Sequence, residues 1–417
     1  MEQNYVVYHL HDDEGSLLDS CTKWKDYVDL AASYGMKAIA STNHGYNLNW
    51  TDKKQYAEKK GLKFIVGCEV YLTSDMYHYP EISDEVYESY QGWDPKEAQE
   101  AIGKMMDEGR YKVRDNFHTI LLCKNAYGVL ELNNIMSASY DADHKYYKPR
   151  ITFDEFFSLS DNIIKISACL ASPLRKYTPE CDGYRQEVYD KLCETYDYYE
   201  IQYHDCDDQK EYNQYLWELS KKYHKPLIAA TDTHSLNAYK AECRKILMMG
   251  KGIEFTGEDE FDLTFKSYDE LFDAFTVQDA LPREVWMEAI ENTNRMADSI
   301  RDFTLNTKAR YPILTGSSKS DAKMYVERTH AMFNDKVSHG IIPSDEVEQF
   351  KADIEEELTV FKKTNMLGFM LSMSDLMIWG KKEKIPFGPS RGSVAGSRCA
   401  FVTDIIDVDP VRWNLVF

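Results

Sequence analysis

The chain has 417 residues, of which 43% are apolar, and a formal net charge of -21. This length predicts two or three domains with their own cores. The negative charge would repel a polyanion at long range, so any contact with DNA must be local. The sequence shows no run of about 18 apolar residues and no basic segment before an apolar one at the N-terminus, so we expect no membrane span, no signal peptide and a cytoplasmic location.

The nine cysteines are scattered along the chain without any Cys-x-x-Cys pair. An odd number of cysteines in a chain of this length argues against a disulfide framework. We therefore expect reduced thiols, which agrees with a cytoplasmic location.

Residues 1 to about 275 alternate between strand-length apolar runs and amphipathic stretches, which favours an α/β barrel or a wound sheet. A polar, acidic and Tyr-rich stretch near residues 75–115 interrupts this rhythm, and we interpret it as a partly helical surface insertion. The alternation stops near residue 280, so we expect one domain over residues 1–280 and a second, mostly helical segment over 281–417. In that segment an acidic helix is predicted over about 344–363, with its Asp and Glu residues on a solvated face.

Five of the strand-length apolar runs lead into a histidine, a carboxylate or a cysteine. In α/β barrels and open sheets the functional groups gather where the strands end, so a single site built from several strands is expected. This mixture of ligand types indicates a polynuclear metal centre. The residues at the five ends are His9 and His11, Asn43 and His44, Glu69, Cys169, and Asp232 and His234.

Each of these residues also has a simpler interpretation when it is taken alone. The His9-x-His11 pair projects two imidazoles to one side of a strand, which suits metal ions, but polar packing gives the same pattern. His118 begins an apolar run and is compatible with a core histidine, and Cys169 is compatible with a small buried hydrophobic residue. Glu69 can bridge two metals, whereas a single glutamate at a strand end more often lies on the surface. Their joint occurrence favours the metal centre.

A glycine- and serine-rich segment over residues 387–397 lies in a basic stretch. Between positions 381 and 398 there are five basic residues and one acidic residue, a net charge of +4. Small residues allow close approach of the backbone, amides at a helix start attract phosphate oxygens, and Arg391 adds a fixed cation. The segment therefore predicts a phosphate-binding loop, although flexible surface loops have a similar composition.

The motifs of the first domain, taken in order, form a family pattern. They are His9-x-His11, Thr42-Asn43-His44-Gly45, Gly67-x-Glu69-x-Tyr71, His118, Ser167-Ala168-Cys169-Leu170 and Asp232-x-His234. This order resembles the polymerase and histidinol phosphatase (PHP) domain at the N-terminus of bacterial C-family replicative DNA polymerases, the DNA polymerase III alpha subunits. The resemblance implies a distorted (β/α)7 barrel, and it places the family's metal ligands on His9, His11, Asn43, His44, Glu69, His118, Cys169, Asp232 and His234.

The resemblance also implies the chemistry of this site. It implies a metal-dependent 3′–5′ exonuclease with zinc, manganese or both, up to three ions, and with catalytic roles for Glu69, Asp232 and His234. Ions about 3.5–4 Å apart lower the pKa of a bridging water and stabilise the attacking and leaving oxygens of a phosphodiester. Asn43 stands where the family usually has aspartate, and a neutral amide is a poorer ligand. We therefore expect one metal position to be lost or weakened, with Asp12 or Asp13 as candidate replacements.

The segments around the glycine-rich loop resemble the opening of the palm domain of the same polymerases. The segments that carry this resemblance are Leu367-Gly368-Phe369, the loop over 387–397, and Asp404 to Pro410. It implies a partial, mostly helical palm segment, in which the triphosphate of the incoming nucleotide is bound by Arg391, Gly392, Ser393 and Ser397. The three aspartates at 404, 407 and 409 are interpreted as structural. The family's catalytic aspartates lie beyond Phe417, so we expect polymerase activity to need magnesium and a second polypeptide that carries the rest of the polymerase.

The leading hypothesis is thus the N-terminal portion of a replicative C-family DNA polymerase. Its expected partners are DNA, deoxynucleoside triphosphates and replisome subunits, in the cytoplasm of a bacterial or phage-infected cell. One alternative is a freestanding PHP phosphoesterase acting on a small phosphate monoester, which leaves residues 281–417 without a role. Another is a non-catalytic PHP domain that serves as a structural scaffold in a replisome, which Asn43 favours.

Overall fold

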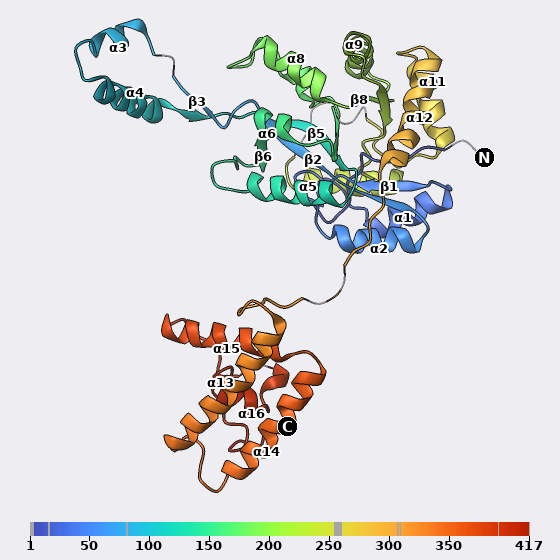
Figure 1. The fold of residues 1–417 in the computed structure, drawn as a ribbon. Coiled ribbons are helices and arrows are strands. Elements are labelled where there is room, and N and C mark those ends of the chain that lie inside the picture. The colour runs from blue at the N-terminus through green and yellow to red at the C-terminus, as the bar shows by residue number, and fades with distance from the viewer. Residues whose placement is uncertain are drawn as a thin grey trace. The chain divides into compact units, whose positions relative to one another are not determined.

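The computed structural model describes residues 4–15, 17–80, 82–253, 261–306, 308, 310–390 and 392–416. The chain divides into two compact units, Met1–Leu305 and Asn306–Phe417, which are described separately (Figure 1). The strands of the first unit are β1 (Ala38–Ser41), β2 (Lys63–Thr73), β3 (Tyr77–His78), β4 (Tyr111–Lys112), β5 (Phe117–Cys123), β6 (Arg150–Thr152), β7 (Ile163–Ile166), β8 (Tyr199–Gln202) and β9 (Leu227–Ala230). Its helices are α1 (Trp24–Ser33), α2 (Trp50–Lys59), α3 (Asp84–Ser89), α4 (Pro95–Gly109), α5 (Ala126–Ser139), α6 (Phe153–Ser158), α7 (Pro173–Lys176), α8 (Gln186–Thr195), α9 (Asp207–Tyr223), α10 (Ala238–Gly250), α11 (Tyr268–Gln278) and α12 (Arg283–Ser299).

The main strands of the first unit form a ring that closes on itself. In order, the neighbours are segment 5–10, β1, β2, β5, β7, β8, β9 and again segment 5–10. Three of these links are isolated bridges, namely Val7 with Ile39, Ile166 with Tyr198, and Leu10 with Thr233. The ring confirms the predicted α/β fold and has the seven strand segments expected of a (β/α)7 barrel.

One strand of the ring runs against the others. β5 is antiparallel to both β2 and β7, whereas the remaining links are parallel. The start of β5 therefore lies at the rim where the parallel strands end. This reversal explains why His118 lies at the beginning of an apolar run, while the other candidate ligands follow theirs.

The side chains of the ring separate into two cores because successive residues of a strand point to opposite faces. One cluster contains small and branched residues from alternate strand positions, including Val6, Ala40, Ile65 and Ile120, and corresponds to the barrel interior. The other cluster packs the outer face of the strands against the surrounding helices. In α1, the residues that face this outer core recur at helical spacing, at Trp24, Tyr27, Val28 and Ala31.

Helix α12 belongs to the first unit, which therefore extends to Leu305, past the boundary expected near residue 280. The backbone N–H of Val6 donates to Thr293 Oγ1 at 3.0 Å, and Asn292 Nδ2 donates to the carbonyl of Leu227 at 2.8 Å. Both contacts lie where strands begin, at the barrel end opposite the candidate ligands. The helix also adds apolar side chains to the interior cluster, namely Met296, Ala297 and the following Ile300.

Residues 75–115 form an insertion made of α3, α4 and the short antiparallel pair β3 and β4 (Figure 1). Its base is tied to the barrel by Arg150, which is fully buried at the start of β6. Arg150 Nη1 donates to the carbonyl of Val113 at 2.6 Å, and Arg150 Nε donates to the carbonyl of His144 at 3.2 Å. A buried guanidinium needs several acceptors, and here backbone carbonyls accept from Nε and Nη1.

The second unit is helical in its described residues. Its elements are α13 (Ser318–Ser338), α14 (Val347–Lys363), α15 (Leu367–Lys382), the single 3₁₀ turn η2 (Gly392–Val394) and α16 (Arg398–Val402). They pack around an apolar core that includes Tyr325, Phe350, Ile354, Leu371 and Phe401.

The prediction that the acidic residues of α14 lie on a solvated face is wrong for two of them. Asp353 and Glu357 are buried, because they share a helix face with Phe350 and Ile354. Arg398 Nε lies 2.9 Å from Asp353 Oδ2, and Glu357 accepts hydrogen bonds from the backbone N–H groups of Arg398 and Cys399. These carboxylates thus join α14 to the start of α16.

Among the described residues, no helix combines the length and the apolar character needed to cross a membrane.

Gly67 in β2 gives a test of how tightly the barrel is packed. An added Cβ there would lie 2.6 Å from Leu122 Cδ2, 2.9 Å from the carbonyl oxygen of Leu121 and 3.0 Å from Thr42 Cγ2. We expect Gly67→Ala to lower the free energy of unfolding by about 1–3 kcal/mol, measured by urea denaturation, because overpacking forces neighbouring strands apart. Gly103→Ala in α4 is the matched control, since nothing lies within 4 Å of its added Cβ. A Gly67→Ala chain as stable as the control would contradict this packing.

Candidate metal centre

The barrel rim brings together eight of the nine candidate ligands from six different strand segments. His9 and His11 end segment 5–10, His44 follows β1, and Glu69 lies within the long strand β2. His118 begins β5 opposite Tyr71, which places it on the same sheet face as Glu69. The remaining ligands follow β7 and β9, and they are Cys169, Asp232 and His234.

The Glu69 carboxylate is the centre of this group and is 1% exposed. Its Oε2 atom lies 3.3 Å from His9 Nε2, 3.2 Å from His11 Nε2 and 2.9 Å from His44 Nδ1. Its Oε1 atom lies 2.8 Å from His118 Nδ1. The two oxygens therefore face different ligand groups, which is the arrangement expected of a carboxylate that bridges two ions.

Asp232 lies beside the first group of ligands. Its Oδ1 atom is 3.0 Å from His9 Nε2 and 3.4 Å from His11 Nε2. His234 stacks on His11 with 4.2 Å between ring centroids, and its Nδ1 atom lies 2.9 Å from the backbone carbonyl of Asp232. That hydrogen bond fixes the ring and leaves Nε2 as the nitrogen able to bind a metal.

Cys169 lies beside the second group of ligands. Its Sγ atom is 3.8 Å from His118 Nδ1 and 4.0 Å from Glu69 Oε1. Burial raises the pKa of this thiol, and the neighbouring carboxylates Asp232 and Glu69 raise it further. Because a metal binds the thiolate, an ion held by Cys169 must displace the thiol proton.

Several buried polar atoms at the centre make no well-directed hydrogen bond to the described residues, although three of them have an oxygen or a ring nitrogen 2.9–3.4 Å away. They are both ring nitrogens of His11, Nδ1 of His44 and Oδ1 of Asp232. Buried polar groups are nearly always satisfied, so a cluster of unsatisfied lone pairs that point at one another needs a reason. Divalent cations satisfy such a set, and the imidazole, carboxylate and thiol donors suit zinc or manganese. The residues present therefore fit a metal centre.

The charges of the carboxylates and histidines agree with this interpretation. Burial raises the pKa of Glu69, but His44, His118 and His9 outweigh it and hold that pKa well below its usual range. Burial lowers the pKa of His44 by more than the Glu69 carboxylate raises it. For His11, burial lowers the pKa, but the carboxylates of Asp232 and Glu69 outweigh it and raise the pKa to about 9. Metal binding at His11 must therefore release a proton at neutral pH.

Glu200 in β8 is a supporting residue that the sequence interpretation missed. It is 1% exposed, and its Oε1 atom accepts a hydrogen bond from His9 Nδ1 at 2.8 Å. Tyr8 and Gln202 donate to the same carboxylate. A carboxylate behind a histidine fixes the ring and raises its basicity as a ligand. The sequence did contain one signal, a charged residue inside the buried strand run Tyr199–Gln202. The interpretation considered only residues at strand ends and therefore missed it.

Asn43 is the candidate ligand that the structure does not bring to the cluster. Its side chain is hydrogen-bonded to Asp12 instead, through both Oδ1 and Nδ2 at 2.8 Å. Asn43 is 1% exposed, so water does not compete with these bonds.

The candidate triphosphate-binding residues lie in the second unit. Arg391 falls outside the described residues, and Gly392 and Ser393 are exposed in η2. Ser397 caps α16 by accepting from the backbone N–H of Ala400, and it donates to Glu357 Oε2 at 2.5 Å. Gly392 and Ser393 are thus open to solvent, whereas the Ser397 hydroxyl is already hydrogen-bonded.

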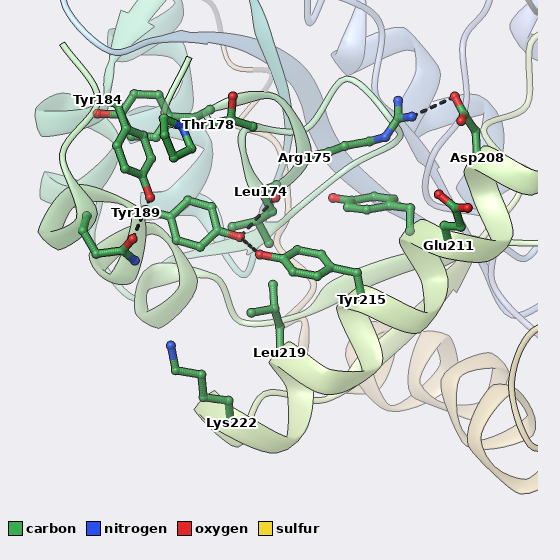
Figure 2. Close-up of a pocket in the computed structure, with 14 residues that line it drawn as sticks. Leu174, Arg175, Thr178, Tyr184, Tyr189, Asp208, Glu211, Tyr215, Leu219 and Lys222 are labelled. Atoms are coloured by element: carbon green, nitrogen blue, oxygen red, sulfur yellow. Dashed lines mark hydrogen bonds and ion pairs between the residues drawn. The ribbon is translucent and has the colours of Figure 1, made fainter. Parts of the chain in front are cut away.

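A pocket of about 580 Å³ lies among α7, α8 and α9, separate from these ligands (Figure 2). The hydroxyls of Tyr189 and Tyr215 meet there, and Tyr189 donates to the carbonyl of Leu174 at 3.1 Å. Arg175 and Asp208 form an ion pair of 2.7 Å at the pocket. The described residues that line the pocket include none of the candidate metal ligands.

The role of Glu200 can be tested with an isosteric variant. We expect Glu200→Gln to weaken metal binding about 10–100-fold, because His9 loses its charged hydrogen-bond partner. The measurement is competition for zinc between the chain and a chelator of known affinity. Glu194→Gln, at an exposed position of α8, is the control and should bind as the wild type does. Unchanged affinity in Glu200→Gln would contradict the role assigned to this carboxylate.

Two separate parts of the chain match the models of known protein families. Residues 8–204 match the family model of the PHP domain, and residues 324–417 match the model described as the bacterial DNA polymerase III alpha NTPase domain. The DNA polymerase III subunit alpha of Aquifex aeolicus is 28% identical over 434 aligned residues, which cover 100% of this chain and 35% of that protein. The subunit from Helicobacter pylori is also 28% identical and covers 100% of this chain and 34% of its own length.

Solved structures give a weaker likeness. A putative metal-dependent phosphoesterase from Bifidobacterium adolescentis aligns over 55% of this chain and 87% of its own, with 14% identity and a TM-score of 0.30. The chain spans about a third of the length of the curated relatives that it matches. Its two parts are thus similar to a PHP domain and to the DNA polymerase III alpha NTPase domain, and over its whole length it is similar to about a third of DNA polymerase III alpha subunits.

Proposed function

We propose that this chain is the N-terminal portion of a replicative C-family DNA polymerase whose PHP site is a metal-dependent 3′–5′ exonuclease. The observation that carries the proposal is the convergence of eight donor side chains, centred on Glu69, together with buried ring nitrogens and carboxylate oxygens that a divalent cation would satisfy. The relatives support the polymerase context, since those from Aquifex aeolicus and Helicobacter pylori are DNA polymerase III alpha subunits. The cytoplasm of a bacterial or phage-infected cell is the proposed location.

The residues of the site have distinct proposed roles. His9, His11, Glu69 and Asp232 would hold one ion, and His118, Cys169 and the other oxygen of Glu69 would hold a second. When bound, zinc or manganese would supply an activated water and charge stabilisation for phosphodiester hydrolysis. Glu200 would orient His9 through its Nδ1 atom, and the carbonyl of Asp232 would orient His234.

The chain's own charges would position the DNA end. The rim carries ionised carboxylates, so a phosphodiester can approach only when cations neutralise them. Activity would therefore depend on added metal. A protein of net charge -21 would also accept a short single-stranded end more readily than a long duplex.

In the second unit, we propose that the loop 387–397 binds the triphosphate of an incoming deoxynucleotide. The exposed Gly392 and Ser393 and the net charge of +4 around them support this role. Arg391 is included on its sequence position alone. For Ser397 the same role requires its hydroxyl to leave Glu357.

Polymerisation itself would use magnesium and the regions of the relatives that lie outside the matched third. A second polypeptide or a continuation of the same one would supply those regions, and contacts with replisome subunits belong to the same proposal.

The nuclease is tested by release of nucleotides from the 3′ end of a labelled single-stranded DNA with added zinc or manganese. We expect cleavage by the wild-type chain, and a loss of at least about 100-fold in Asp232→Asn and in His118→Ala, because each removes a metal ligand. His339→Ala, an exposed histidine of α13's C-terminal end, is the matched control and should retain full activity.

Either of two results would contradict the nuclease. One is equal cleavage by the wild type and Asp232→Asn, which indicates a contaminating enzyme. The other is a metal-loaded chain that releases no nucleotides, which favours a structural PHP domain.

A further inference from the structure

A tight turn over residues 144–149 lies at the barrel rim beside the candidate metal ligands. An added Cβ on Gly45, the residue after His44, would lie 2.7 Å from Pro149 Cγ, so the end of the turn packs directly against the loop that carries this ligand. Before the turn, the Tyr140 hydroxyl donates to the carbonyl of the same glycine at 3.1 Å. The chain on both sides of the turn is therefore attached next to His44.

Lys148 in this turn brings a positive charge close to the ligands. Its Nζ atom lies over the ring of Tyr71, 5.1 Å from the ring centroid, in a cation–π contact. The Tyr71 ring also contacts His44 and His118, with 5.8 Å and 5.2 Å between the ring centroids. Tyr71 thus connects Lys148 to two of the ligands, and a phosphate group that approaches the rim meets this ammonium group.

Hydrogen bonds fix the backbone of the turn. The N–H of Tyr146 donates to the carbonyl of Lys148 at 3.1 Å, and the N–H of Lys148 donates to the carbonyl of Tyr146 at 2.7 Å. The carbonyl of Lys145 accepts from Lys112 Nζ at 3.3 Å. A turn that is already ordered loses little conformational freedom when a ligand binds to it, so its side chains are preorganised.

Tyr147, at the tip of the turn, has neither a favourable backbone conformation nor a buried side chain. Its φ angle is 59°, in the left-handed region that bulky residues rarely adopt, and it is 85% exposed. Glycine would suit this backbone better, and burial does not explain the aromatic ring. Strained backbone of this kind clusters at binding sites, and an exposed aromatic ring suits stacking on a planar group.

The charges near the tip are positive on balance, although the whole chain has a net charge of -21. The exposed charged residues of the segment 141–148 are two lysines and two aspartates, and Lys112 adds a third cation through its contact with the turn. Both aspartates precede the tip, whereas the two lysines lie on either side of it. Cations interleaved with exposed aromatic rings suit single-stranded nucleic acid, because its phosphates attract lysine and its bases stack on the rings.

We propose that the turn 144–149 binds single-stranded DNA beside the metal centre, with the ring of Tyr147 stacked on a base near the 3′ end and with Lys145 and Lys148 in contact with backbone phosphates. Tyr147 acts as a positioning residue, since it holds the strand whose terminal phosphodiester enters the rim. This inference rests on the proposed nuclease for the choice of strand, but it concerns binding and not hydrolysis.

Binding is measured on the whole chain with manganese, by fluorescence anisotropy of a short single strand. The strand carries a 5′ fluorophore and phosphorothioate linkages at its 3′ end, which resist hydrolysis, and gel electrophoresis verifies that it stays intact. We expect Tyr147→Ala to raise the Kd about 10-fold, which is typical of the loss of one stacked base, and Tyr147→Phe to bind as the wild type does because its ring still stacks. Tyr127→Ala is the matched control, because Tyr127 is 76% exposed on α5, which follows β5 at the barrel end opposite the ligands.

The two lysines are tested through the salt dependence of binding. On a single strand, the slope of log K against log salt concentration changes by about 0.7 for each phosphate that a cation neutralises. The double variant Lys145→Gln, Lys148→Gln should therefore have a slope that is shallower by about 1.4. Tyr147→Ala should lower the affinity and leave the slope unchanged, since it removes stacking and no charge.

Three results would each overturn the proposal, namely wild-type affinity in Tyr147→Ala, an equal loss of affinity in Tyr147→Phe, or an unchanged slope in the double lysine variant. Circular dichroism verifies that each variant is folded, which is expected because the three side chains are exposed. A chain that binds the strand through Tyr147 but releases no nucleotides contradicts the nuclease alone. A chain that releases nucleotides and binds the strand equally well without the Tyr147 ring contradicts this inference alone.

Discussion

A buried carboxylate, Glu69, is the constraint on which the first unit depends. Moving an ionised carboxylate out of water is costly unless positive charge or hydrogen bonds replace the lost solvation. Here four histidines from three strand segments surround it, and three of them lie within 3.3 Å of a single oxygen. Segment 5–10, β1, β2 and β5 are consecutive neighbours in the sheet, and closure of the ring through Leu10 and Thr233 places Asp232 and His234 beside them. The antiparallel direction of β5 adds His118 at the rim, and α12 closes the opposite end with apolar side chains.

Much of this centre could be predicted from the sequence, because a ligand at a strand end leaves a local mark. His9, His11, Asp232 and His234 follow buried runs, and the rule that strand ends share a rim brings them together. The sequence could not show partners that meet only through the fold. His9 and Glu200 are 191 residues apart, and Asp12 and Lys53 are 41 apart, so no pattern of period or spacing links them. The prediction that the acidic residues of α14 are solvated was wrong for a similar reason, because the partner of Asp353 is Arg398, which lies in a distant part of the sequence.

Buried charge also organises the second unit, but with a different outcome. Asp353 and Glu357 turn inward and hold the start of α16, so that the carboxylate of Glu357 occupies the backbone amides and the Ser397 hydroxyl there. Gly392 and Ser393 stay open to solvent. In the first unit, the carboxylates lie among metal-binding side chains that lack hydrogen bonds. In the second unit, the carboxylates accept hydrogen bonds from the N–H and O–H groups around them. The first unit therefore has a site whose charges suit bound cations, whereas the buried charges of the second unit are already paired.

The central claim is that Glu69 bridges two metal ions at the barrel rim. The most direct measurement is a crystal structure of the manganese-loaded chain with anomalous diffraction data recorded near the metal's absorption edge. The account predicts two anomalous peaks, one beside Oε2 of Glu69 with His9, His11 and Asp232, and one beside Oε1 with His118 and Cys169. Absence of any peak at Glu69, or a peak with Asn43 among its ligands, would contradict it.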